Sequence, residues 1–139
     1  MKFSVTQKGK PLSKSKYTWD EKTCIFSTME DNLVLDFSNY SHCTFNTGWG
    51  CTFTTGWNCT FTTDSHCTFN TGSSCTFNTG RSCTFKTDWS CTFTCGEKCV
   101  VVRRDVYEII EVPVGVKIIL NGNGIKGISN KEEVMEALL

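Results

Sequence analysis

Residues 43–98 read CTFNTGWG, CTFTTGWN, CTFTTDSH, CTFNTGSS, CTFNTGRS, CTFKTDWS and CTFTCGEK. These seven octapeptides follow one another without an insertion, and a cysteine opens each of them. A strict short period is the sequence signature of a repeat architecture, in which each unit stacks on a copy of itself. The period therefore predicts the fold of the chain before any other feature is considered.

The first five residues of each unit alternate as a half-buried strand does. In the first copy, one side carries Cys43, Phe45 and Thr47. The other side carries Thr44 and Asn46. Cysteine and phenylalanine are core residues, so we expect the first side inside and the second in solvent. If the second threonine is buried, its hydroxyl needs a backbone partner.

The sixth position of the unit holds either glycine or aspartate. The residues concerned are Gly48, Gly56, Asp64, Gly72, Gly80, Asp88 and Gly96. Both residue types tolerate a positive φ, so the pattern predicts a left-handed corner at this position. Two variable residues then complete a tight turn before the next cysteine.

Identical strands joined by identical corners predict an all-β fold, a small parallel β-solenoid. Two coil sizes are compatible with the period: a flat coil of two octapeptides and a triangular coil of three. His42 and His66 are separated by three octapeptides, which favours the triangle, whereas Trp57 and Trp89 are separated by four, which favours the flat coil. We favour the flat coil, because facing phenylalanines can fill the ~10 Å between two packed sheets.

The flanking segments are expected to cap the stack, with an N-terminal cap at 1–42, the solenoid at 43–98 and a C-terminal cap at 99–139. In the first cap, a hairpin is predicted between residues 17–19 and 24–28, where CIFST is a degenerate repeat. Leu35 lies one octapeptide before Cys43, which predicts that it occupies a cysteine slot. Caps matter because both ends of a solenoid expose unpaired strand edges.

The C-terminal cap is predicted to contain three apolar strands and a short helix. The strands are expected within 100–102, 106–112 and 116–120, separated by turn signals. Ser129 and Glu132 form a capping-box pattern, so the helix should start there and run to Leu139. The helical residues expected to face the body are Val134, Met135 and Leu138.

Charge and hydropathy argue against several classes of partner. The 139 residues carry no net charge, and no basic stripe or acidic tail is present, so no nucleic-acid partner is expected. No apolar run approaches the length of a membrane span, roughly 18 residues or more, so no membrane partner is expected. The opening MKFSVTQKGK lacks the apolar core of a secretory signal, so we expect synthesis in the reducing cytoplasm.

The ten cysteines are expected to be reduced, buried thiols that act as small hydrophobic side chains. Stacked cysteines on parallel strands would keep their Cβ atoms slightly too far apart for an unstrained disulfide. Cys91, Cys95 and Cys99 resemble a ligand cluster, but their spacing matches no zinc pattern. No metal and no cofactor are therefore expected.

Catalysis is not expected from this sequence. His42 and His66 each precede a cysteine, but neighbours along a strand point in different directions. The candidate binding residues are instead Trp49, Trp57 and Trp89, which share one turn position. Exposed tryptophan is costly unless it packs on something, so we expect contact with a glycan, a protein partner or a second copy. The alternative is that these side chains pack against the caps.

Ice binding is a further alternative, because outward threonines recur in every repeat. The outer positions hold Thr44, Thr52, Thr60, Thr68, Thr76, Thr84 and Thr92. Threonine arrays on a flat sheet resemble the surfaces of some antifreeze solenoids. Here the second outer column is interrupted by Asn46, Asn70, Asn78 and Lys86, which argues against this alternative, and threonine is also an ordinary exposed strand residue.

The repeat CTFxTGxx, entered through KYTWDEKTCIFST and left through KCVVVRRDVYEII, resembles a group of uncharacterised octapeptide-repeat proteins of tailed bacteriophages and metagenomes. The resemblance extends from about residue 17 to 128. It implies a small β-solenoid of viral or prophage origin, and it transfers no functional residues. Together with the repeats, it leads us to expect a non-enzymatic structural or interaction protein, one that could be associated with a virion.

Overall fold

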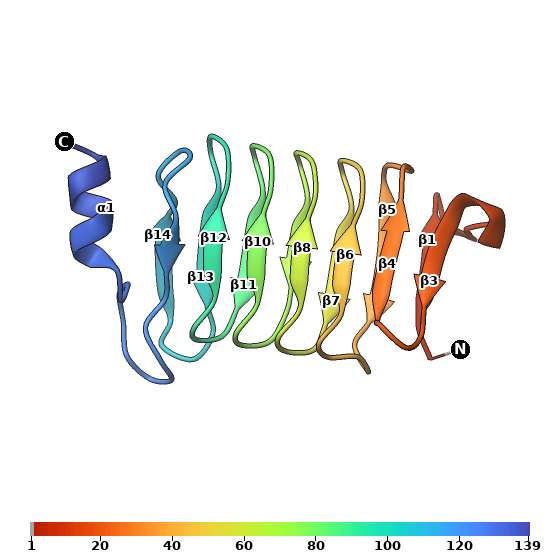
Figure 1. Cartoon of the computed structure of the whole chain (residues 1–139), viewed down its shortest axis with the longest axis horizontal. Coiled ribbons are helices and arrows are strands. Elements are labelled where there is room, and N and C mark those ends of the chain that lie inside the picture. The colour runs from red at the N-terminus through yellow and green to blue at the C-terminus, as the bar shows by residue number, and fades with distance from the viewer. Residues whose placement is uncertain (1) are drawn as a thin grey trace.

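In a computed structural model, which describes residues 2–139, the repeats stack into a β-solenoid with 16-residue coils. Each coil contributes one strand to each of two facing sheets, and equivalent strands of successive coils pair in parallel (Figure 1). Phe61, for example, lies opposite Phe45 on one side and Phe77 on the other. The flat, two-layer coil is therefore confirmed, and the triangular one is wrong.

Sheet A contains eight strands in the order β14-β13-β11-β9-β7-β5-β1-β2. Their bounds are β1 Ser4–Gln7, β2 Lys10–Pro11, β5 Leu33–Phe37, β7 Thr52–Thr55, β9 Thr68–Asn70, β11 Thr84–Thr87, β13 Val100–Arg103 and β14 Glu108–Glu111. Sheet B contains seven strands in the order β15-β12-β10-β8-β6-β4-β3. Their bounds are β3 Tyr17–Asp20, β4 Ile25–Thr28, β6 Thr44–Asn46, β8 Thr60–Thr62, β10 Thr76–Asn78, β12 Thr92–Thr94 and β15 Ile118–Ile119.

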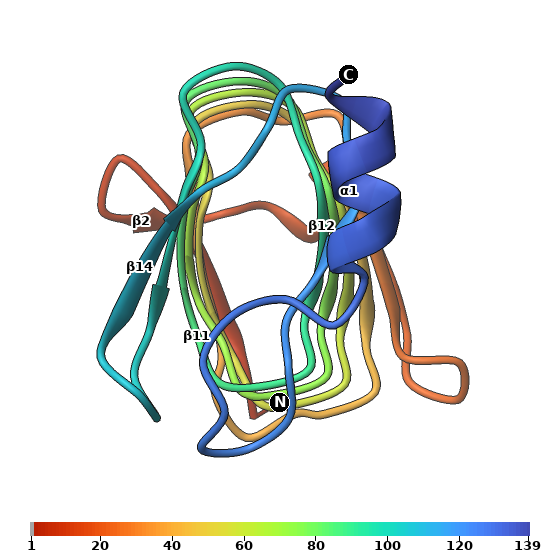
Figure 2. The same ribbon diagram turned by 90° about the vertical axis from the view of Figure 1, so that its left-hand side faces the viewer.

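The interior is a continuous column of phenylalanine rings, as the alternation predicted. Along sheet B, Phe61 and Phe77 stack with ring centroids 4.9 Å apart and planes 4° apart. Across the two sheets, Phe61 meets Phe69 edge-to-face at 5.1 Å. Both geometries are favourable for aromatic pairs, so each ring supports its neighbours along and across the stack. Seen along the axis, the coils lie almost on top of one another (Figure 2).

The second threonine of the unit is also on the inner side. Its hydroxyl donates to the carbonyl of the following residue, as from Thr55 to Gly56 at 3.2 Å and from Thr79 to Gly80 at 3.2 Å. The need for a backbone partner is thus met in the corners of Thr47, Thr55, Thr63, Thr71 and Thr79. Among the described residues, the Thr87 hydroxyl is the one buried side-chain oxygen or nitrogen without a partner.

The prediction of a left-handed corner at the glycine or aspartate slot is wrong. The positive φ falls two residues later, directly before each cysteine, as at Asn58 (φ 57°) and Ser74 (φ 59°). Where the sixth position is glycine, as at Gly56, the reason is instead the close approach of the neighbouring coil. A Cβ atom on Gly56 would lie 2.4 Å from the carbonyl oxygen of Tyr40.

The N-terminal cap contains the predicted hairpin, β3 and β4, and β4 continues sheet B by placing Phe26 opposite Phe45. The predicted slot of Leu35 is wrong, since Leu35 lies opposite Phe53 and Leu33 takes the cysteine slot. The cause is a longer corner between Phe37 and Cys43 than between Thr55 and Cys59, the equivalent positions of a regular unit. The strand β1 and the 3-10 helix Lys14–Lys16 complete this end.

The C-terminal cap continues both sheets and ends in the helix α1, Lys131–Ala137, at the end of the stack (Figure 1). The predicted capping box does not form. Asn130 is the N-cap residue, and its side chain is used elsewhere: it accepts from the Ile119 amide at 3.0 Å and donates to the Lys117 carbonyl at 2.9 Å. Val134 is buried as expected, whereas Met135 and Leu138 are exposed, contrary to the prediction.

Candidate functional site

The three tryptophans of the shared turn position lie on two different edges of the stack. Because one coil contains two octapeptides, successive turns alternate between the edges. Trp49 lies in a turn from sheet B to sheet A, between β6 and β7. Trp57 and Trp89 lie in turns from sheet A to sheet B, on the opposite edge. The structure therefore brings two of the three candidate residues to one surface and leaves Trp49 apart.

Trp57 and Trp89 are two rungs apart, with the Ser73 turn between them. The amide of Asn58 donates to the Ser73 carbonyl at 2.9 Å, and the amide of Ser74 donates to the Trp89 carbonyl at 2.9 Å. Two rungs correspond to about 9.6 Å along the stack. We call the surface formed by Trp57, Ser73 and Trp89 the tryptophan edge.

The indole of Trp57 projects from the tryptophan edge and is held from one side. It is 52% exposed, and the ring of His42, on the preceding rung, meets it edge-to-face at 4.6 Å. Trp89 is half-buried. An exposed indole supported by a second ring combines apolar area with low conformational freedom, which suits the binding of a ligand with an apolar face.

The cysteines form two buried columns inside the corners, with no disulfides. In the column at the start of the sheet B strands, the amide of Cys59 donates to Cys75 Sγ at 3.4 Å, and the amide of Cys75 to Cys91 Sγ at 3.4 Å. The thiols in turn donate to carbonyls of the corners, as from Cys75 to Ser73 at 3.6 Å. The expectation of buried thiols is confirmed for nine cysteines, and Cys24 is half-buried.

Burial sets the chemistry of most of these thiols. Burial, together with the neighbouring Cys59, raises the pKa of Cys43 to about 12. Hydrogen bonding to Cys75 and burial raise the pKa of Cys59 as well. In the other column, a hydrogen bond from Cys67 lowers the pKa of Cys51 to about 7, although its thiol is inaccessible. The reactive form of the thiol is therefore either disfavoured or shielded from solvent.

A buried ion cluster in the C-terminal cap was missed by the sequence reasoning. The fully buried guanidinium of Arg103 pairs with Asp105 at 2.6 Å and lies 3.7 Å from Glu108. It also donates to the carbonyls of Ile125 at 2.5 Å and Gly122 at 3.2 Å. The sequence could have indicated it, because Arg103 lies two residues after Val101 and four after Cys99, and alternation along a strand places all three side chains on the inner side. The cluster fastens the 121–127 loop to the end of sheet A.

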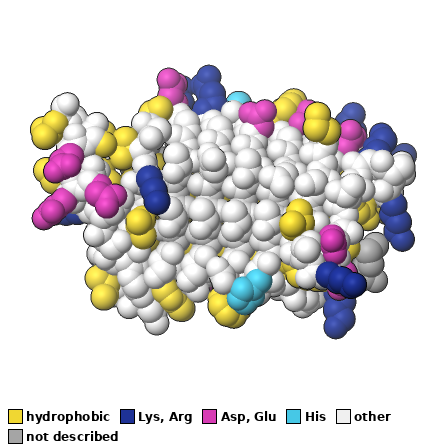
Figure 3. Space-filling model, in the orientation of Figure 1, with side chains coloured by type: hydrophobic (Ala, Val, Ile, Leu, Met, Phe, Trp, Pro, Cys, Tyr) yellow, Lys and Arg dark blue, Asp and Glu magenta, His cyan; other side chains and the backbone are white. Residues whose placement is uncertain are grey.

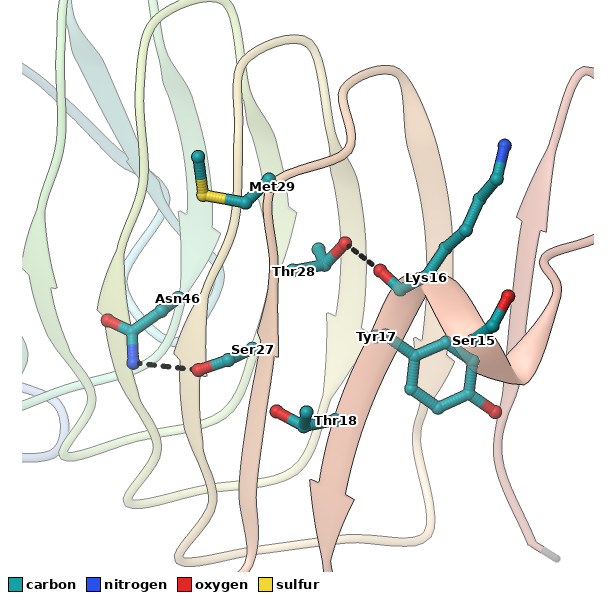
Figure 4. A pocket seen from close by; sticks show the side chains of 8 residues that line it. All are labelled: Ser15, Lys16, Tyr17, Thr18, Ser27, Thr28, Met29 and Asn46. Atoms are coloured by element: carbon teal, nitrogen blue, oxygen red, sulfur yellow. Dashed lines mark hydrogen bonds between the residues drawn. The ribbon is translucent and has the colours of Figure 1, made fainter.

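A surface pocket of about 410 Å³ lies at the N-terminal end of sheet B (Figure 4). Its lining residues are Ser15, Lys16, Tyr17, Thr18, Ser27, Thr28, Met29 and Asn46. The hydroxyl of Thr28 donates to the Lys16 carbonyl at 2.8 Å, and the amide of Asn46 donates to Ser27 at 3.4 Å. The first bond joins the 3-10 helix to β4, and the second joins β4 to the repeat strand β6.

Among residues 2–139, no group of three or more histidine, cysteine, aspartate or glutamate side chains is arranged to hold a metal ion. None of the helices in this part of the chain is long and apolar enough to cross a bilayer. In comparisons with known proteins, no family model, no curated protein and no solved structure matches the chain. The fold itself defines the class: a capped, two-sheet parallel β-solenoid with a phenylalanine core.

Proposed function

We propose that this chain is a non-enzymatic structural and interaction module that binds an extended glycan along its tryptophan edge. The observation that carries the proposal is the placement of Trp57 and Trp89 on one edge, two rungs apart, on a rigid stack. The burial of the chain's most reactive side chains in packed columns supports a structural rather than a catalytic role.

The spacing of the two indoles favours a polysaccharide over a single sugar. Two rungs, about 9.6 Å, are comparable to the length of one disaccharide in an extended β-1,4-linked chain. Sugars one disaccharide apart could then stack on Trp57 and Trp89, with the hydroxyl of Ser73 between them as a hydrogen-bonding group. Aromatic side chains suit this role because their flat faces bind the apolar faces of sugars while the rim stays polar.

Calorimetric titration with chitohexaose and cellohexaose tests the proposal. We expect binding by the unmodified chain and loss of binding in Trp57→Ala/Trp89→Ala, since each large aromatic contact contributes about 2 kcal/mol or more. Trp49→Ala is the matched control, because Trp49 occupies the same turn position on the opposite edge and should leave affinity unchanged. Binding that survives the double substitution, or fails for both sugars, overturns the glycan proposal.

Self-association is the competing use of the same edge. Sedimentation analysis of the unmodified chain should give the monomer mass of 15.6 kDa. A dimer that dissociates in Trp57→Ala/Trp89→Ala but not in Trp49→Ala would assign the tryptophan edge to a second copy instead of a glycan.

The proposed origin in a tailed phage or prophage, and the proposed association with a virion, rest on the resemblance of the repeat and of its flanks. The gene is expected to lie among genes for phage tail or particle proteins. A location within a metabolic operon of a cellular genome would contradict this part of the proposal.

A further inference from the structure

We propose that the outer face of sheet B adsorbs to ice. We call this surface the threonine face. Its first column consists of Ile25, Thr44, Thr60, Thr76 and Thr92, and its second of Ser27, Asn46, Thr62, Asn78 and Thr94. This inference goes beyond the proposed function, because the threonine face and the tryptophan edge are different surfaces of the stack.

The two columns are in strict register across the parallel strands β4, β6, β8, β10 and β12. Thr60 lies directly opposite Thr44 and Thr76, and Thr62 lies directly opposite Asn46 and Asn78. Neighbouring members of a column are therefore about 4.8 Å apart, and the two columns about 6.6 Å apart. The result is a two-dimensional lattice of hydroxyl, methyl and amide groups with fixed spacings.

No charged side chain belongs to the two columns of the threonine face. Figure 3 shows this face toward the viewer, with uncharged surface across its centre and the charged side chains at the ends and along the rims. Charged groups border the face at both ends: Asp20 lies opposite Ile25 and Lys16 borders the pocket of Figure 4 at the N-terminal margin, and the exposed Lys117 directly precedes β15, which pairs with β12, at the C-terminal margin. An ice surface is also uncharged, so the two surfaces are complementary in charge.

The opposite face, on sheet A, has the same repeat but a different character. The second outer column of sheet A runs from Asp36 through Thr54 and Asn70 to Lys86, so it contains two charged side chains. Arg104 reaches over this face to hydrogen-bond Asn70 and the carbonyl of Thr71. Lys86, which argued against ice binding in the sequence, therefore lies on sheet A, whereas Asn46 and Asn78 remain in the second column of the threonine face.

The physical basis is the hydration of each face. A charged group binds water in an orientation that an ice lattice cannot share, whereas a threonine methyl is weakly hydrated and its hydroxyl can replace a lattice water. The spacings persist because the threonine face lies on packed Phe45, Phe61, Phe77 and Phe93 rings, and close-packed interiors hold side chains and strands in place.

Thermal hysteresis and partitioning of the protein into a growing ice front test the inference on the full chain. We expect both effects for the unmodified protein and loss of both in Thr76→Lys, which places a charge at the centre of the threonine face. Thr68→Lys is the matched control, because Thr68 is exposed and flanked by threonines in the same way on sheet A. It should retain both effects.

Circular dichroism at the assay temperature establishes that both lysine variants are folded. Absence of hysteresis and of partitioning in the unmodified protein would overturn the inference, as would equal losses in Thr76→Lys and Thr68→Lys. The Trp57→Ala/Trp89→Ala variant separates this inference from the proposed function, since it should lose glycan binding and retain ice adsorption. Loss of ice adsorption in that variant would assign adsorption to the tryptophan edge and overturn the role of the threonine face.

Discussion

The guanidinium of Arg103 lies 2.6 Å from a carboxylate oxygen of Asp105, and both side chains are buried beneath the C-terminal cap. The pair stands at the end of sheet A, where Arg103 occupies the inner position opposite Thr87. Charges in such a place are stable only when they are paired and their hydrogen-bonding groups are satisfied. The carbonyls of Gly122 and Ile125 complete the shell around the guanidinium.

Replacing Arg103 by methionine should strongly destabilise the protein. The substitution keeps most of the side-chain volume but leaves the buried Asp105 carboxylate without its partner, at an expected cost of about 3–5 kcal/mol. Urea titration measures the free energy of unfolding of both variants. Arg104→Met is the control, because that side chain is 42% exposed and its ion pair with Asp88 should contribute ~1 kcal/mol or less. Equal losses in the two variants would contradict the structural role of Arg103.

Acid should weaken the same cap. Burial alone would raise the pKa of Asp105, but hydrogen bonds and charge from Arg103, with the Gly124 amide, lower it below its usual value. A carboxyl whose pKa is lower in the folded state contributes stability above its unfolded pKa, about 3.9, and loses it as the pH falls through the folded value. The free energy of unfolding should therefore drop below about pH 4, and less steeply in Asp105→Asn. Parallel pH profiles for the two proteins would exclude this contribution.

Gly56→Ala tests whether the close approach of the neighbouring coil requires glycine at this sixth position. The added Cβ would meet the Tyr40 carbonyl oxygen at 2.4 Å and the Ser41 hydroxyl at 2.6 Å, so the coils must separate locally. We expect a loss of about 1–3 kcal/mol in thermal or urea unfolding. Gly122→Ala is the control, since nothing lies within 4 Å of its added Cβ. A harmless Gly56→Ala would show that neighbouring corners are not in contact.

Alkylation should distinguish Cys24 from the other cysteines. At pH 8 the native protein should incorporate a single carbamidomethyl group, at the half-buried Cys24, because the other nine thiols are buried. After unfolding in guanidinium, all ten should react. Mass spectrometry counts the groups, and Cys24→Ser should remain unlabelled in the native state. Rapid native labelling of Cys51, whose pKa is lowered, would show that the corner opens.

The sequence predicted the position of a residue best where a single physical requirement determines the type of that residue. Cysteine and phenylalanine occupy alternate positions on the inner side of each strand because the interior must be filled, and both were placed correctly. Coil length was ambiguous, because residues such as His42 and Trp57 lie in the corners, outside the repeating core, and follow no common period. Glycine has two uses, positive φ and close approach, and Gly56 serves the second. Leu35 was misplaced because its slot depends on the length of a corner that the repeat does not encode.

The candidate site could be predicted as a set of residues but not as a surface. Trp49, Trp57 and Trp89 were identified from their turn position, yet which of them share an edge depends on the coil size. The coil size also decides which sheet carries Lys86, and the two-octapeptide coil places it on sheet A, away from the threonine face. Asn130 shows a different limit: its side chain had two possible sets of partners, the helix amides and the strand β15, and tertiary contacts selected the second.

The two-unit coil has a consequence for how such a gene can change. Tandem repeats in DNA gain or lose copies by replication slippage, and one octapeptide advances the chain by half a coil. A single added copy would turn everything C-terminal to it by half a revolution, moving Trp89 to the other edge and Lys86 onto the threonine face. Two added copies would lengthen the stack and restore every surface. For the proposed roles of the tryptophan edge and the threonine face, octapeptides should therefore be gained or lost in pairs. The sequence of a single octapeptide does not reveal this constraint.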